Sequence, residues 1–528
     1  MSGTGVPRPA GEVTPAQAGG VLGVAFMVVY ALTRTRDLGG DGTVFAQAVE
    51  AWLRQGSVWR TFFHPHHVLY NPLVALCTAG GRLLAPGLLS VDGGAFLSAA
   101  CAAAAVGLLT SLLMRRGMPT GISILAGTVM GVSGGLWQFG TRIEVYALAA
   151  LAVVVWLDLL SREAPRPGAA GLGLAAALLS HLAMVVLAPA TFLRTAPPAR
   201  RRAAALALGL GTPALVLALL FSIRSGVHPA AWLHELLPAS SHDYLRPDPE
   251  GPLRALEGLL WWGWYRGTPV LTGAATGVLE QLAVSASVLA AVLALAGALH
   301  LRLRGPGSRL RTTALLALGG FLPLWLVWDT GNVEHTVASA PLWAVLLAAG
   351  ARRLPRRTGS VALGLLALCL AAGNGLGSAI PQARPENGRV WVLASFVRET
   401  VPPEATVLSV GTDPRLRLGL PYLSGRHVVD LTLAVAAARR QGRDPHLALA
   451  YWLERARSAG TVWLLPDVLD PGSEQRAEEL GIAPEAWRRA TSMFTVLQVK
   501  TLPPDGIVLR RPFQLSLASV REGTAVPP

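Results

Sequence analysis

The polar residues best suited to chemistry lie in one stretch of the chain, directly after its first apolar segment. Two carboxylates and three histidines gather there: Asp37, Asp41, His64, His66 and His67. A carboxylate can take a proton from a hydroxyl group, and imidazole rings can bind a substrate or a divalent metal ion. We therefore interpret residues 34–67 as an active-site loop.

Composition places this loop on a membrane protein. The 528 residues are 52% hydrophobic and 14% charged, and their mean hydropathy is +0.46. Soluble domains carry about 25% charged residues, and many runs here approach the roughly 20 apolar residues that cross a bilayer. We expect a polytopic α-helical membrane protein, whose first run, 18–33, is a retained span and not a signal peptide. Residues 1–17 are expected to be a disordered cytoplasmic tail.

The net charge of +14 comes from arginines in short loops between apolar runs. This pattern is the positive-inside signal of membrane topology, and no basic face with base-reading elements indicates nucleic-acid binding. Lysine occurs only at Lys500, which suggests a G+C-rich bacterial genome. The expected location is therefore the bacterial cytoplasmic membrane.

Spans and arginines together predict about eleven membrane helices within residues 18–383, with the N-terminus inside. Residues 68–86 must begin and end outside, so we expect an interfacial helix there. Residues 169–193 have basic loops at both ends. Two half-helices folded as a hairpin, with His181 near the tip, satisfy this charge pattern, because broken helices belong where they line a cavity.

The composition of the chain changes after residue 383, where charged residues become frequent. Residues 384–528 are predicted to form a small α/β domain outside the membrane, a cap or scaffold without a phosphate-binding glycine motif. Strands are expected at 406–410, 427–431, 461–465, 494–499 and 507–510. Helical patterns fill 390–400, 432–458 and 472–490.

Carboxylates at the outer ends of spans are the first candidates for catalysis. An acid beside a bilayer is costly to desolvate, so one that faces inward is a functional candidate. Asp37 and Asp41 follow the first span, and Glu144 follows the third. Each has a structural alternative: a loop charge for Asp37, a helix N-cap for Asp41 and a dipole interaction for Glu144.

Several short motifs occur in order along residues 18–380. They are Asp41-Gly-Thr-Val-Phe45, His64-Pro-His-His67, Glu144-Val-Tyr146, Ser180-His181-Leu182 and Glu334-His335. This arrangement resembles the GT-C superfamily of membrane glycosyltransferases, and more narrowly the protein O-mannosyltransferase-like family of unknown function. The chain lacks a second acid directly beside Asp41, so Asp37 or Glu144 is left as its partner carboxylate.

The resemblance implies an inverting transfer of a sugar from a polyprenyl-phosphate donor to a hydroxyl of a glycan, lipid or protein acceptor at the outer face. Asp41 would act as the general base, and arginines would bind the departing phosphate. No cofactor is required, although the histidines and Asp41 could hold a divalent metal ion. The expected substrate contacts are His64, His66, His67, Arg142, Tyr146, His181, Arg266, Glu334 and His335.

Two other functions compete with glycosyl transfer. A transporter or lipid flippase would want paired broken helices in two related halves, but the sequence has one such hairpin and no repeat. A noncatalytic membrane scaffold would leave the acids scattered, whereas the transferase requires them at one outer cavity beside an arginine.

Overall fold

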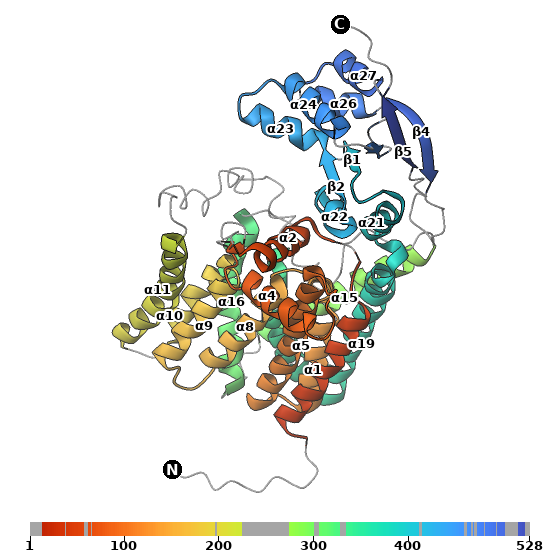
Figure 1. Cartoon of the computed structure of the whole chain (residues 1–528). Coiled ribbons are helices and arrows are strands. Elements are labelled where there is room, and N and C mark those ends of the chain that lie inside the picture. Colours follow the sequence, from red (N-terminus) through yellow and green to blue (C-terminus); the bar gives the residue numbers. More distant parts are fainter. Residues whose placement is uncertain are drawn as a thin grey trace. The chain divides into compact units, whose positions relative to one another are not determined.

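The computed structural model of the chain comprises two compact units (Figure 1). A helical unit contains residues 1–34 and 45–381, and an α/β unit contains residues 35–44 and 382–528. The structure describes residues 13–36, 38–56, 62–64, 66–195, 198–223, 274–299, 306–327, 334–410, 414–458, 462–465, 468, 472–479, 481–492, 494–501 and 516–522.

Apolar helices make up the helical unit. In chain order they are α1 (Pro15–Leu32), α2 (Gly40–Gln55), α4 (Tyr70–Arg82), α5 (Ser90–Arg115), α6 (Thr120–Gly131), α7 (Gly134–Gly140), α8 (Tyr146–Leu160), α9 (Pro167–Ser180), η1 (Leu182–Leu187), α10 (Ala188–Arg194), α11 (Ala199–Ile223), α15 (Ala274–Ala298), α16 (Pro306–Val327), α17 (Glu334–Val337), α18 (Ala340–Arg353), α19 (Arg356–Asn374), η2 (Gly375–Ala379) and α20 (Ile380–Ala383). The first residues of α2 and the last residues of α20 belong to the α/β unit.

Among the described residues, 4 helices are long and apolar enough to cross a membrane, or up to 5 if the bent pair α6 and α7 counts as one span. These two helices meet at an angle of 63°. Other apolar helices, among them α8 and α9, are shorter. The prediction of a helical membrane protein is confirmed, while the count of about eleven membrane helices stays a prediction.

The segment around His181 folds back on itself. Its backbone is extended at His181 (φ −160°, ψ 126°), between α9 and η1. The His181 ring lies against Tyr146, the first residue of α8, whereas Thr191 in the second arm accepts a hydrogen bond of 3.0 Å from Trp156 near the end of α8. Since α9 itself starts shortly after α8 ends, the second arm returns toward the end of the bundle from which the first arm left.

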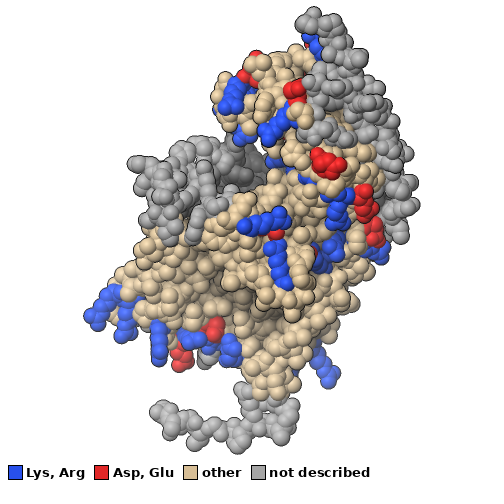
Figure 2. All heavy atoms as spheres, viewed as in Figure 1, with Lys and Arg blue, Asp and Glu red and all other residues tan. Residues whose placement is uncertain are grey.

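Arginines gather along one end of the helical unit, at the lower edge of Figure 2, beneath a surface with few charges. Arg115, Arg116 and Arg162 all pair with Asp158, at 3.3, 3.0 and 3.3 Å. This segregation is the positive-inside pattern in three dimensions. An inside N-terminus and an outside α/β unit remain predictions from it.

Glycines allow α15 and α18 to approach closely. A Cβ atom on Gly350 would overlap the carbonyl oxygen of Leu293, and one on Gly297 would overlap that of Leu346. Small residues commonly bring membrane helices into backbone contact. These two glycines therefore fix the distance between the helices.

We expect Gly350→Ala to lower the melting temperature of the purified protein. The backbone atoms that the added methyl group would overlap must move, and overpacking of this kind costs about 1–3 kcal/mol. The matched control is Gly364→Ala on α19, where nothing lies within 4 Å of the added carbon. That change should be neutral or stabilising by up to about 1 kcal/mol, the helix-propensity gain of alanine. Equal effects of the two variants would contradict the close approach.

The α/β unit is built on a five-stranded sheet of order β2-β1-β3-β5-β4. The strands are β1 (Thr406–Ser409), β2 (His427–Asp430), β3 (Val462–Leu464), β4 (Phe494–Thr501) and β5 (Ser516–Glu522). β1 pairs in parallel with β2 and β3, whereas β5 is antiparallel to β3 and β4. The helices are η3 (Pro385–Asn387), α21 (Arg389–Thr400), α22 (Pro414–Ser424), α23 (Leu431–Arg440), α24 (Pro445–Ser458), α26 (Gly472–Glu479) and α27 (Pro484–Ser492). Buried Leu408, Val435, Leu453 and Trp487 lie in its core.

Several predicted boundaries need correction. The helical pattern at 432–458 is two helices, because Gly442 between them adopts a left-handed φ of 70°. Likewise, 472–490 contains α26 and α27 with Gly481 (φ 82°) before the second. The expected strand 507–510 lies outside the described residues, and the described last strand is β5. Helix α1 starts at Pro15, so the predicted tail of residues 1–17 includes its first turn.

A domain boundary at residue 384 misses an N-terminal contribution. Residues 35–44 belong to the α/β unit. There the backbone N–H of Arg36 donates to the carbonyl of Gln382 at 2.8 Å, and the Arg36 guanidinium lies 5.1 Å from the Trp391 ring centroid. The segment that follows the first span is therefore built into the second unit.

Candidate active site

Two carboxylates from distant parts of the helical unit meet at one arginine. Arg142 lies in the turn between α7 and α8, with its Nε 4.0 Å from Glu144 Oε1. Its Nη2 is also 4.0 Å from Oε1 of Glu334, the first residue of α17. Glu144 is only 3% exposed, and the guanidinium carbon of Arg142 lies 4.3 Å from the centroid of the Phe139 ring. Burial strengthens these electrostatic interactions.

Tyr146 connects this charged group to the His181 break. Its hydroxyl donates a hydrogen bond of 3.0 Å to Glu334 Oε2. Its ring centroid lies 5.3 Å from that of His181 and 5.0 Å from that of Phe139. Because Tyr146 begins α8, the helix holds the phenol at the edge of the charged group.

The tip of the hairpin is bonded to the loop that follows α2. The N–H of Leu182 donates to the His66 carbonyl at 2.8 Å, and the N–H of Leu69 donates to the Leu179 carbonyl at 3.2 Å. The His67 ring lies 5.6 Å from that of His181. Histidines predicted from two separate motifs therefore lie together.

The surroundings of His67 favour its neutral imidazole form. Burial lowers its pKa well below the usual range, and the nearby His64, His181 and His66 lower it further. Its ring stacks on that of His64 at 4.3 Å. The buried Nδ1 atom of His67 has no hydrogen-bond partner in the described part of the chain.

Ser98 on α5 anchors the backbone of this site, and the sequence analysis missed it. Its hydroxyl donates to the Glu144 carbonyl at 3.1 Å, accepts from the Glu144 N–H at 3.4 Å and lies 3.2 Å from the Tyr70 hydroxyl. The signal in the sequence is weak, because small residues are common throughout α5. Ser98 thus fixes the backbone at Glu144, just before α8 begins.

Of the two first-loop carboxylates predicted to act in catalysis, Asp37 and Asp41, the structure describes only Asp41. Asp41 lies in the first turn of α2, which begins at Gly40, so the N-cap alternative is wrong. The Asp41 side chain is exposed, and the residue belongs to the segment 35–44 that forms part of the α/β unit. Its pairing with Glu144 stays a prediction. Asp37, Arg266 and the side chain of His335 lie outside the described residues.

The rings of His64 and His67 are stacked, whereas the His66 ring lies edge-on to both. Across the described residues, no group of three or more His, Cys, Asp or Glu side chains is arranged to hold a metal ion. The divalent metal suggested from the sequence therefore has no geometric support within that part of the chain.

No protein-family model matches the sequence, and no curated protein matches it significantly. Two solved structures of ArnT from Cupriavidus metallidurans, one bound to undecaprenyl phosphate and one in the apo state, each share 12% sequence identity with the chain at a TM-score of 0.59. The matches cover 94% and 96% of this chain, and 97% and 98% of the ArnT chains. The Saccharomyces cerevisiae protein O-mannosyltransferase Pmt1-Pmt2 complex, bound to its sugar donor, matches 48% of the chain at a TM-score of 0.30, too low to carry an argument. At this identity the likeness concerns the fold alone, and the chain has the fold of ArnT.

Proposed function

We propose that this protein is an integral membrane glycosyltransferase that moves a sugar from a polyprenyl-phosphate donor to an acceptor hydroxyl at the outer face of the bacterial cytoplasmic membrane. The observation that carries the proposal is the arginine held between two carboxylates. The ArnT-like fold supports the reaction class, and the ArnT structure bound to undecaprenyl phosphate suggests the donor class.

Arg142 suits the departing phosphate. Its contacts with Glu144 and Glu334 are at 4.0 Å, which is longer than a tight charge-assisted hydrogen bond of about 2.7–2.9 Å. A phosphate oxygen can therefore compete with either of these two carboxylates for the guanidinium. Glu144 and Glu334 then serve to position the arginine.

In the proposed reaction, Asp41 accepts the proton of the acceptor hydroxyl, and the acceptor oxygen forms a bond to the anomeric carbon. The bond from that carbon to the phosphate oxygen breaks, and its electron pair leaves with the lipid phosphate. Attack from the face opposite the phosphate inverts the configuration. Arg142 stabilises the charge on the leaving group, while Tyr146, His67 and His181 contact the sugars.

The test measures transfer of labelled sugar from a panel of polyprenyl-phosphate sugars by the purified full-length protein. We expect Asp41→Asn to reduce transfer by about 100- to 10,000-fold, the usual contribution of a general base. The control is Glu163→Gln, whose side chain is 81% exposed and pairs with Arg309. Undiminished transfer by Asp41→Asn would reject this base, whereas failure of the parent protein with every donor would reject the proposed donor class.

A further inference from the structure

We propose that the α/β unit carries a separate binding site for an anionic saccharide, in the pocket between α23 and α24. The pocket has a volume of about 710 Å³, within the range of about 300–1,000 Å³ that is usual for small-molecule sites. All of its lining residues belong to the α/β unit. The inference therefore stands independently of the proposed transfer reaction.

Small side chains keep this space open. Where α23 faces α24, the lining consists of alanines on both helices: Ala434, Ala437, Ala438 and Ala448. On the opposite side, Val435 and Leu453 of the same helices are buried in the core of the unit. The two helices are thus held together by that core, while their outer faces stay apart.

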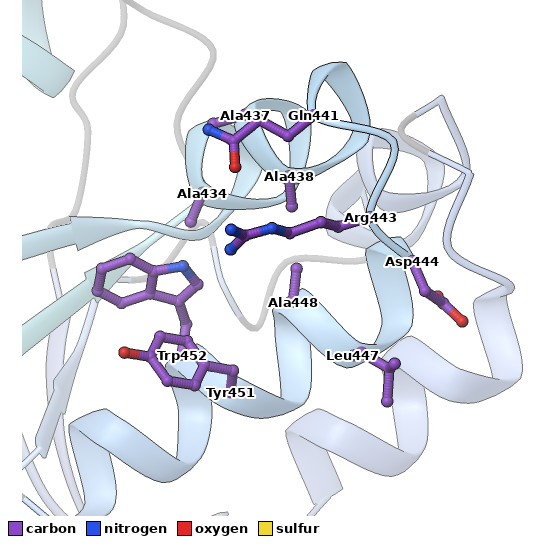
Figure 3. A pocket seen from close by; sticks show the side chains of 10 residues that line it. All are labelled: Ala434, Ala437, Ala438, Gln441, Arg443, Asp444, Leu447, Ala448, Tyr451 and Trp452. Carbon is purple, nitrogen blue, oxygen red and sulfur yellow. The ribbon is translucent and has the colours of Figure 1, made fainter.

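Two aromatic side chains form one wall of the pocket. Trp452 and Tyr451 line it side by side (Figure 3). The Arg455 guanidinium lies 5.4 Å from the Trp452 ring centroid and donates a hydrogen bond of 3.0 Å to the Tyr451 hydroxyl. The C–H face of a sugar ring packs well on such a surface, because a large aromatic ring offers apolar area beside a polar atom.

A cation extends into the same space. Arg443 runs between Ala438 and Ala448, with its guanidinium directed toward Trp452 (Figure 3). In the described part of the chain, its side chain makes no ion pair or hydrogen bond. Asp444 points away from it in Figure 3 and accepts the N–H of His446 at 2.7 Å. The arginine is therefore available to an anionic ligand.

These groups define the ligand. Guanidinium binds a carboxylate or phosphate through paired hydrogen bonds, and the Gln441 amide can bond to hydroxyl groups at the rim. A uronic acid or a sugar phosphate combines the required ring and charge, whereas a neutral sugar leaves Arg443 unused.

The experiment measures binding by isothermal titration calorimetry with the full-length chain in lipid nanodiscs and empty nanodiscs as the blank. The probes are cellobiouronic acid, glucose 1-phosphate, inorganic phosphate and neutral cellobiose. We expect one or both charged sugars to bind at least about tenfold more tightly than cellobiose and phosphate. The two charged sugars distinguish a carboxylate from a phosphate as the bound group.

Three variants locate the site. Arg443→Gln should weaken binding of the charged sugar about tenfold, the effect of losing roughly one charge-assisted contact. Ala437→Leu should also weaken it by filling the space, whereas Arg440→Gln, a charge change outside the lining, should have little effect. Since Arg443 and Ala437 are both exposed, these changes leave the core intact. No binding by the parent, equal binding of cellobiose, equal binding of inorganic phosphate, or unchanged binding by both pocket variants would each overturn the proposal.

Discussion

Replacement of Arg142 by glutamine is expected to reduce sugar transfer about 1,000-fold with little change in the KM for the donor. The reason is that the phosphate gains its charge as the sugar leaves, so the guanidinium acts most strongly in the transition state. Arg142→Lys should recover part of the loss, because it keeps the charge but cannot form two parallel hydrogen bonds. The matched control, Arg162→Gln, removes a half-exposed arginine that pairs with Asp158.

Folding must be separated from catalysis in this experiment. Loss of Arg142 removes a cation that lies 4.0 Å from Glu144, which is only 3% exposed, and removing one partner of a buried ion pair destabilises a protein. The double variant Arg142→Gln with Glu144→Gln restores the balance of charge. If this variant melts near the parent temperature and still transfers sugar at the parental rate, Arg142 has no role in the reaction.

Local chemistry made part of the site predictable from the sequence. A histidine inside an apolar run with arginines at both ends indicated the hairpin, because the charges forbid a single crossing. The structure has extended backbone at His181. Likewise, Glu144 and Tyr146 follow directly after an expected span. An acid beside the bilayer is costly to desolvate, so its presence there indicates a functional role. Both side chains lie in the charged group around Arg142.

Contacts between distant segments were not predictable in the same way. Glu334 meets Tyr146 across 188 positions, and no local pattern encodes such a pairing. Residues 35–44 follow the first span without interruption, yet they cluster with the α/β unit through the Arg36 contacts to Gln382 and Trp391. Periodicity reports how one element buries its own face, and it carries no information about which distant segment joins it.

Arg82→Met is expected to lower the free energy of unfolding by about 3 kcal/mol, because it strips the main partner from a buried carboxylate. Arg82 at the end of α4 donates to Glu50 of α2 at 2.7 Å, and Ser90 at the start of α5 donates to the same oxygen at 2.7 Å. Glu50 is 9% exposed, so this cluster ties three helices together. Arg54→Gln is the control: Arg54 also contacts Glu50, at 3.1 Å, but is 71% exposed and should matter by at most about 1 kcal/mol.

The pH dependence distinguishes this charge pairing from simple packing. Burial raises the pKa of Glu50, but hydrogen bonds from Ser90 and Arg82 and the charges of Arg82 and Arg54 outweigh it, so the pKa lies below its usual range. The paired carboxylate therefore stabilises the parent above the pKa of the unfolded state, and this contribution is lost as the pH falls through the folded-state pKa. In Arg82→Met, burial dominates and favours the protonated acid, so the stability difference between variant and parent should narrow from pH 7 toward pH 4. Chemical denaturation at several pH values measures the free energy of unfolding of variant and parent. A difference between them that does not change with pH would show that Arg82 acts through its packing alone.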